Sequence, residues 1–457
     1  MSNKIIVLSL DGTMDSLETI PTHIAEIQNL LGEHVKFTDE DNHPEQGWNA
    51  KSIYETEEQY NDKVKKPAIL SYYLDGLGAP HVDKDGHFIK WSKKPKQFFK
   101  KLEDTVEELG ESAFAEGINQ KVAHAYHFLA THYVPGDKVF CFGFSRGSYE
   151  AILLAKIIGR IGLINVHSRA FADDYHAQLD RAMKYAFHCT DEEALKFKAK
   201  YSYDGKDLIH FMGLFDPVKG LVAPKVPDDH NMGNVVKHLR EALAADEHRI
   251  EYPNIDVQVS EESCARSCWF PGSHGDVGGD YKKLKQLSNI PLHWILEEAM
   301  DCGLPVNQKK LAEDYPQDAL APQHNSRADS IPYSGGMLPW KDISPHHERQ
   351  IGNKRRGETF HPSTLYRYGH MVKTQDLDRK WVTTEYKPTN VNKAVQLLND
   401  PRRANEAQQS VLMFNRRNGY PIPKQLPLTD KDIKTKLANE KEVRELIIDR
   451  QLGRKRG

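Results

Sequence analysis

Short apolar runs alternate with amphipathic stretches along the first two thirds of this chain. The apolar runs predict buried strands at residues 5–10, 69–73, 139–142, 208–215 and 264–270. Apolar residues recur at helical spacing between Ile118 and Tyr133, so this stretch is predicted to be a helix that packs on the sheet. Strands that alternate with helices are typical of an α/β fold with a mostly parallel sheet flanked by helices.

The remaining stretches are less regular. Residues 33–91 are polar, lysine-rich and aromatic, and we interpret most of them as an insertion or long loops. Residues 239–245 favour a helix. We place a catalytic α/β domain at residues 1–305, with a helical cap at about residues 166–206. Residues 306–457 are assigned to a C-terminal extension or accessory cap region.

A glycine-rich turn carries the clearest chemical signal. An apolar strand enters Gly-Phe-Ser-Arg-Gly at residues 143–147, and a helix-forming stretch follows directly. In a nucleophile elbow, such a strand, turn and helix hold a serine with its hydroxyl exposed. The glycines avoid side-chain clashes in the tight turn, and the helix points its positive end at a developing oxyanion. Ser145 is therefore the predicted nucleophile.

Two later residues follow strands and complete a predicted serine hydrolase site. A serine hydroxyl needs a histidine to take its proton, and the histidine needs a carboxylate to fix its tautomer. Asp216 follows the strand at 208–215, and His274 follows the strand at 264–270. In α/β-hydrolases the chain order is serine, acid, histidine, at the carboxyl ends of strands. We therefore expect Asp216 to orient His274, and His274 to activate Ser145.

The oxyanion formed during attack needs two N–H donors. The first is expected from the backbone of Arg146, directly after the nucleophile, and the second from Gly12 or Thr13 in the loop after the first strand. Asp-Gly-Thr also occurs in phosphatases that use an aspartate nucleophile two residues before this aspartate. Because Ser9 occupies that position, it offers no carboxylate for the covalent intermediate.

Other residues stay open as alternatives within the site. Asp276 lies in a glycine-dense loop, where it either competes with Asp216 as the orienting acid or caps the turns of its own loop. A third interpretation is a cation site that Asp276 shares with Asp11 or Asp280. His361 is a rival general base, since chain order alone does not exclude it. The chemistry requires no organic cofactor and no metal.

Composition agrees with an enzyme made inside the cell. The 457 residues can bury a large core, and 28% charged with 39% hydrophobic residues is ordinary for a soluble protein. The formal net charge of −3 gives no indication of nucleic-acid binding. Five cysteines imply no disulfide framework, and Cys264 with Cys268 lacks the second pair of a zinc site. The first apolar run is too short for a signal peptide or membrane span, so a cytoplasmic protein is expected as synthesised.

A series of motifs runs along the chain. They are Asp-Gly-Thr at 11–13, Gly-Phe-Ser-Arg-Gly at 143–147, Gly-Leu-Phe-Asp-Pro-Val at 213–218, Ala-Leu-Ala-Ala-Asp-Glu-His-Arg at 242–249 and Trp-Phe-Pro-Gly-Ser-His-Gly-Asp-Val-Gly-Gly at 269–279. Together they resemble the α/β-hydrolase family that includes type VI secretion phospholipase effectors. The resemblance covers roughly residues 4–305 and implies a triad of Ser145, Asp216 and His274 that hydrolyses phospholipid acyl esters.

The resemblance also implies partners and a location. An effector of this kind would be delivered to another cell by a specialised secretion system, with a secretion or immunity partner and transient contact with a membrane surface. Two positions depart from the family pattern: Met14 replaces the usual aromatic residue, and Ile152 stands where an arginine is expected. These positions shape the pocket or the packing behind it, which leaves substrate choice open.

We therefore predict a serine hydrolase that cleaves an acyl ester of a lipid or phospholipid. Two alternatives stay open, namely a hydrolase of a small soluble ester or thioester and a non-catalytic binding protein that keeps the fold. A lipid substrate calls for an apolar cover near the serine. Apolar residues at helical spacing could form that cover or pack in the core: Phe171, Tyr175, Leu179, Met183 and Phe187. The basic residues 354–356 either meet anionic head groups or form a solvated face, and residues 434–450 predict a charged terminal helix.

Overall fold

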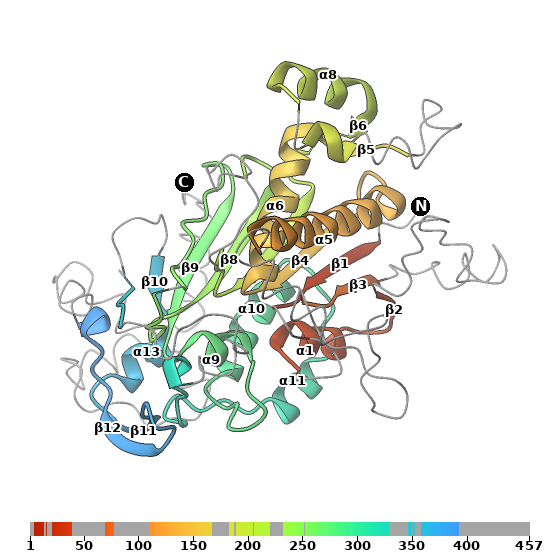
Figure 1. Ribbon diagram of the computed structural model, residues 1–457. Coiled ribbons are helices and arrows are strands. Elements are labelled where there is room, and N and C mark those ends of the chain that lie inside the picture. Colours follow the sequence, from red (N-terminus) through yellow and green to blue (C-terminus); the bar gives the residue numbers. More distant parts are fainter. Residues whose placement is uncertain are drawn as a thin grey trace, which may run out of the picture.

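The central sheet organises the molecule (Figure 1). The computed structural model describes residues 4–12, 15, 21–38, 69–76, 110–166, 182–186, 189–203, 205–219, 232–250, 252–328, 346–349, 351 and 358–392. Within these residues the main sheet has eight strands in the order β10-β9-β8-β7-β4-β1-β3-β2, and every pairing is parallel. The strands are β1 (Ile5–Leu10), β2 (His34–Thr38), β3 (Ile69–Leu74), β4 (Lys138–Phe144), β7 (Ile209–Phe215), β8 (Val236–Ala244), β9 (Cys264–Phe270) and β10 (Glu358–Phe360). The predicted α/β class with a mostly parallel sheet is confirmed.

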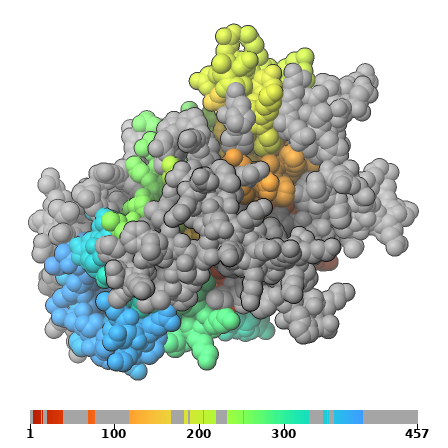
Figure 2. All heavy atoms as spheres, viewed as in Figure 1, coloured from red at the N-terminus to blue at the C-terminus, as the bar shows by residue number. Residues whose placement is uncertain are grey.

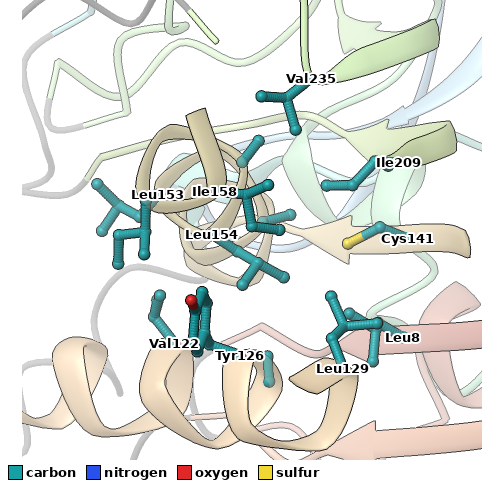
Figure 3. Packing of buried hydrophobic residues seen from close by; sticks show 14 of the residues in the cluster. Leu8, Val122, Tyr126, Leu129, Cys141, Leu153, Leu154, Ile158, Ile209 and Val235 are labelled. Carbon is teal, nitrogen blue, oxygen red and sulfur yellow. The ribbon is translucent and has the colours of Figure 1, made fainter. Parts of the chain in front are cut away.

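One face of the sheet is covered by two long helices, α5 (Gly110–His132) and α6 (Arg146–Ile161). Successive side chains of a strand point to opposite faces, so alternate residues of β1 and β4 join this layer. Figure 3 shows Leu8 beside Leu129 of α5, and Leu154 of α6 in the same cluster as Cys141. The predicted helix between Ile118 and Tyr133 is confirmed by α5.

The opposite face carries the helices α1 (His23–Leu30), α10 (Asn289–Asp301) and α11 (Gln308–Asp314). Here the alternate positions of β4 are aromatic, and Phe140 and Phe142 are fully buried. Helices on both faces leave the strand ends as the accessible rim of the sheet, which is where α/β proteins place their sites. Of the helices that the structure describes, none has the length and apolar content that a membrane crossing requires.

Two local predictions differ from the structure. The helix predicted at residues 239–245 is wrong, because residues 239–244 lie within strand β8, which pairs with β7 and β9. Alanine, leucine and glutamate favour helices in isolation, but the parallel sheet buries this segment and tertiary context overrides propensity. Residues 34–38, interpreted as part of a loop region, form the edge strand β2.

The chain beyond residue 305 also contributes to the sheet. Strand β10 pairs with β9, and it is followed by α13 (Pro362–Arg367) and the hairpin of β11 (Met371–Gln375) and β12 (Trp381–Glu385). Residues of the hairpin region are blue at the lower left of Figure 2. The boundary at residue 305 stays a prediction, but an edge strand of the sheet lies on its far side.

The described part of the predicted cap lies far from the serine end of α6. Helix α8 (Asp191–Tyr201) and the short strands β5 (Leu163–Ile164) and β6 (Ser202–Tyr203) pack at the carboxyl end of α6, at the top of Figure 1. Met183 packs against the apolar cluster of α5 and α6. The other members of the proposed apolar stripe lie outside the described residues, namely Phe171, Tyr175, Leu179 and Phe187. The basic residues 354–356 and the predicted terminal helix at 434–450 also lie outside them.

Candidate active site

Ser145 sits at the sharp junction between β4 and α6. Its backbone has φ 56° and ψ −123°, a conformation that residues other than glycine rarely adopt. A Cβ on Gly143 would lie 2.6 Å from the Cα of Ser148, and one on Gly147 would lie 2.2 Å from the carbonyl oxygen of Leu10. Both glycines are therefore required by close backbone approach, and the strained serine is held between them.

Three side chains from the ends of three strands form one hydrogen-bonded series. His274 Nε2 lies 2.8 Å from Ser145 Oγ, and His274 Nδ1 lies 2.6 Å from Asp216 Oδ2. Ser145 follows β4, Asp216 follows β7 with φ 42°, and His274 begins the short helix α9 (His274–Gly278) after β9. The structure thus brings together the three residues that the sequence singled out. This geometry allows a proton to pass from the serine hydroxyl to the imidazole.

The imidazole of His274 is enclosed by aromatic rings. The centre of the Phe144 ring lies 4.8 Å from the centre of the imidazole, and the Tyr252 ring is nearly edge-on to it with 5.1 Å between the ring centres. Burial lowers the pKa of His274, while the hydrogen bond and charge of Asp216 act in the opposite direction, and the net pKa lies below the ordinary value of 6.5. His274 is therefore neutral near pH 7, as a general base must be.

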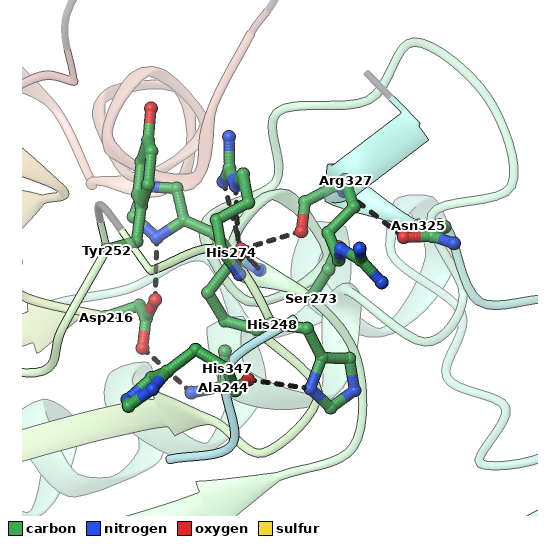
Figure 4. Close-up of polar contacts among 12 residues, drawn as sticks. Asp216, Ala244, His248, Tyr252, Ser273, His274, Asn325, Arg327 and His347 are labelled. Atoms are coloured by element: carbon green, nitrogen blue, oxygen red, sulfur yellow. Dashed lines mark hydrogen bonds and ion pairs between the residues drawn. The ribbon is translucent and has the colours of Figure 1, made fainter. Parts of the chain in front are cut away.

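Asp216 is completely buried and accepts hydrogen bonds on both oxygens. Oδ1 accepts from the backbone N–H of Ala244 at 2.8 Å, a contact shown in Figure 4, and from Arg349 Nη1 at 2.5 Å. Oδ2 accepts from Arg349 Nη2 at 3.0 Å as well as from His274. Burial alone would raise the pKa of Asp216, but the charge of Arg349 and the hydrogen bond from His274 bring it well below its usual range. Asp216 is thus an anion at any pH where the protein would work.

A second buried ion pair supports the same loop. Glu247 accepts from Arg249 Nε and Nη2, both at 2.9 Å, and also from the backbone N–H of His274 at 3.3 Å. Arg249 places its guanidinium 3.6 Å from the centre of the Tyr252 ring. Burial raises the pKa of Glu247, but Arg249 outweighs it and lowers the value to about 2. The start of α9 is therefore anchored by a permanent negative charge.

Asp276 and His361, the alternatives to Asp216 and His274, have hydrogen-bond partners of their own. Asp276 Oδ2 accepts from the backbone and hydroxyl of Ser273, both at 3.1 Å, and Asp276 Oδ1 pairs with His324 Nδ1 at 2.7 Å. Asp276 thus caps the start of α9. The His361 ring caps α13 by accepting from the N–H of Ser363 at 3.2 Å, and it stacks on Phe270. Beside Ser145 the structure places His274.

The loop after β1 bears on the oxyanion donors. The N–H of Gly12 donates to Asp11 Oδ1 at 2.8 Å, so in this conformation it is engaged, and Thr13 lies outside the described residues. Asp11 also accepts from the hydroxyls of Thr22 and Tyr73, and burial raises the pKa of its carboxyl to about 7. The N–H of Arg146 is in the first turn of α6, next to the nucleophile.

Several carboxylates lie near this loop, among them Asp11 and Asp15. The charge of Asp280 adds to burial in raising the pKa of Asp15. Within the residues that the structure describes, no three His, Cys, Asp or Glu side chains converge as metal ligands would. Cys264 and Cys268 both lie in β9 and are free thiols.

Residues missed by the sequence interpretation surround the predicted ones. Glu247 and Arg249 lie in a motif that was recognised without a role for either residue. Arg349 lies in no recognised motif and is 133 positions from the carboxylate that it contacts. A lone arginine in a polar stretch gives no periodic signal, so only the fold could reveal it.

Comparison with known proteins gives one family match and several distant likenesses. The family model described as "T6SS, Phospholipase effector Tle1-like, catalytic domain" matches residues 4–298. Uncharacterized protein YEL023C of Saccharomyces cerevisiae is 26% identical over 264 residues, which is 56% of this chain and 33% of the yeast protein. The match thus spans about a third of that relative's length.

Two solved structures are similar at low identity. The Tle1 effector bound to the VgrG spike of the type VI secretion system has a TM-score of 0.29 and 15% identity, over 61% of this chain and 51% of that chain. An uncharacterized protein from Pseudomonas aeruginosa has a TM-score of 0.36 and 15% identity, over 98% of this chain and 63% of that chain. Both likenesses are too distant to carry an argument about mechanism.

Proposed function

This chain belongs to the family of Tle1-like catalytic domains of type VI secretion phospholipase effectors, and from that premise we propose that it is a serine hydrolase of phospholipid acyl esters. The observation that carries the proposal is the hydrogen-bonded series from Ser145 through His274 to Asp216, at 2.8 and 2.6 Å. A non-catalytic protein that merely kept the fold would be expected to have lost this alignment.

The reaction proposed for this site proceeds through an acyl-enzyme. Ser145 Oγ attacks the ester carbonyl while His274 Nε2 takes the hydroxyl proton, and Asp216 holds the imidazole in the required tautomer. The backbone N–H of Arg146 stabilises the oxyanion, together with a second donor from the loop of Gly12 and Thr13. His274 then gives its proton to the leaving alcohol. Water, activated by the same imidazole, releases the fatty acid and restores the hydroxyl.

The buried surroundings favour this chemistry. The enclosed imidazole is neutral and its partner carboxylate is ionised, so the base is ready without a prior proton transfer. The nucleophile stands at the amino end of α6, whose dipole stabilises negative charge there. No organic cofactor enters any of these steps.

The family also suggests where the activity would operate. We propose that the protein is an effector, delivered to another cell with the help of a secretion partner, and that it contacts membrane phospholipid transiently. An immunity partner would protect the producing cell. The alternative is a hydrolase of small soluble esters or thioesters, because the triad chemistry is the same for both substrate classes.

Phospholipid hydrolysis tests the proposal directly. Purified protein is incubated with phosphatidylcholine and phosphatidylglycerol vesicles, and released fatty acid is measured. Ser145→Ala should lower the rate by about three orders of magnitude or more. Ser148→Ala is a matched control, since this buried serine on the same helix donates to the carbonyl of Phe215 and should leave the rate nearly unchanged. Full activity of Ser145→Ala would refute the proposal, and turnover of short soluble esters alone would favour the alternative.

A further inference from the structure

The guanidinium of Arg349 binds the carboxylate of Asp216, which also accepts a hydrogen bond from His274. Its Nη1 lies 2.5 Å from Oδ1 and its Nη2 lies 3.0 Å from Oδ2, so the guanidinium meets both oxygens in a fork. The side chain is only 1% exposed. Arg349 follows the residues that match the family model, so a part of the chain beyond that match reaches into the site.

Other contacts fix Arg349 in this place. Nη1 also donates to the carbonyl of Ala244 at 3.1 Å, and Nη2 donates to the carbonyl of Tyr252 at 2.8 Å. The side chain of Asn390 donates to the carbonyl of Arg349 at 3.3 Å and to that of Ala245 at 2.8 Å. The guanidinium therefore cannot turn away from Asp216 without breaking several buried hydrogen bonds, which is costly.

The fork has two consequences for the acid. A carboxylate has about four acceptor positions, and here they are filled by Ala244, His274 and two nitrogens of Arg349. The carboxylate is thereby held in one rotamer, with Oδ2 towards the imidazole. The fixed positive charge also opposes the binding of a proton by the Asp216 and His274 pair, because a nearby cation disfavours a further positive charge.

Within the described residues, two further charges that act on His274 come from Glu247 and Arg249. These two residues form an ion pair with each other, so their opposite charges largely cancel at His274. Arg349 is thus the cation that contacts the triad acid directly, and its charge also acts on Glu247. An arginine is suited to this position because its fork matches a carboxylate and its charge does not titrate.

We propose that Arg349 is a positioning residue that sets both the orientation of Asp216 and the proton affinity of the Asp216 and His274 pair. The inference rests on the proposed function, since it assigns Arg349 to the same triad. It extends the catalytic unit into the chain beyond residue 305, because without Arg349 the buried acid loses its counter-charge.

The test follows the pH dependence of Ser145 labelling by a fluorophosphonate, which needs His274 as base but no knowledge of the substrate. Arg349→Met keeps much of the side-chain volume and removes the charge. The acid limb of its labelling rate should move to higher pH by about one unit or more, and the plateau rate should fall. An acid limb at the wild-type position in a folded Arg349→Met protein would overturn the inference.

Arg367→Met is the matched control. Arg367 is equally buried and lies in the same part of the chain, but it donates to the carbonyls of Ala319 and Ala321. This variant should lower the melting temperature and leave the acid limb in place. An equal displacement of the limb in Arg367→Met would show that any buried arginine here acts through general stability, and would overturn the inference.

Arg349→Lys keeps the test decisive where Arg349→Met does not fold. Lysine retains the charge but loses the fork, so the acid limb should stay near its wild-type pH while the plateau rate falls about tenfold. A plateau rate equal to that of the wild-type protein would overturn the role in orientation. Absence of labelling in the wild-type protein would refute the proposed function itself, which separates that failure from failure of this inference.

Discussion

At the scale of single residues, the proton affinity of His274 determines the pH range of the proposed activity. Burial lowers its pKa and Asp216 only partly offsets the effect, so the folded value lies below 6.5. Because the base must be neutral, kcat/KM on a soluble ester should be constant from about pH 7 to 8 and fall only below about pH 6.5. A rate profile on such an ester measures this limb. An acid limb centred above pH 7 would contradict the burial argument.

Substitutions of Asp216 and Asp276 should have different effects, because only Asp216 contacts His274. Asp216→Asn should cost on the order of 10⁴ in rate, because the amide favours the wrong imidazole tautomer. Asp276→Asn removes a cap of α9 and a partner of His324, so it should lower the melting temperature while retaining most of the activity. Rates and melting curves of both variants check the assignment. The reverse result would make Asp276 the orienting acid.

The sequence was most informative where the order of strands and polar residues along the chain predicts which side chains meet in the site. Ser145, Asp216 and His274 could be placed because each follows an apolar strand, and parallel strands bring their carboxyl ends to one edge. Arg349 and the partners of Glu247 could not be placed, since contacts between residues far apart in the chain leave no local pattern. The engaged N–H of Gly12 was equally hidden, because it depends on the rotamer of Asp11.

At the scale of elements, the junction of β4 and α6 should tolerate no side chain at Gly147. A Cβ there would meet two backbone carbonyl oxygens of β1 and its loop, at 2.2 Å from Leu10 and 2.6 Å from Asp11. Gly147→Ala should therefore displace the elbow, abolish labelling of Ser145 and destabilise the fold by about 2 kcal/mol or more.

A glycine in the same helix provides the control for that prediction. A Cβ on Gly159 would lie 3.3 Å from a methyl group of Val235, which can shift, and alanine favours a helix over glycine. Gly159→Ala should change the melting temperature little and leave labelling intact. If both variants kept full labelling, the tight elbow would not be needed for the chemistry.

Element type was predictable where length and flanking residues agreed. The predicted strand at residues 264–270 coincides with β9, since a turn closes it and its second half is buried. Strand β8 was mistaken for a helix because alanine and leucine favour helices, whereas its place between two parallel strands is a property of the whole sheet. Strand β2 lay in a polar region without alternation, and its pairing with β3 decides its conformation.

At the scale of the whole molecule, the chain beyond residue 305 is bound to the sheet. Strand β10 pairs with β9, and Trp269 of β9 packs with Ile351 and Val391. A fragment of residues 1–305 would expose this edge and lose Arg349. It should lack a cooperative melting transition and should not be labelled by a fluorophosphonate. A folded, labelled fragment would show that the boundary at residue 305 separates independent units.

If Ser145 is the activated nucleophile of this site, a reagent that labels activated serines should form its covalent adduct there. Wild-type protein is treated with a fluorophosphonate at pH 7.5, digested, and the adduct is located by mass spectrometry. A single adduct on Ser145 is expected, lost in His274→Ala and retained in His361→Ala. An adduct on another residue, or labelling of Ser145 that survives the loss of His274 but not of His361, would contradict this prediction.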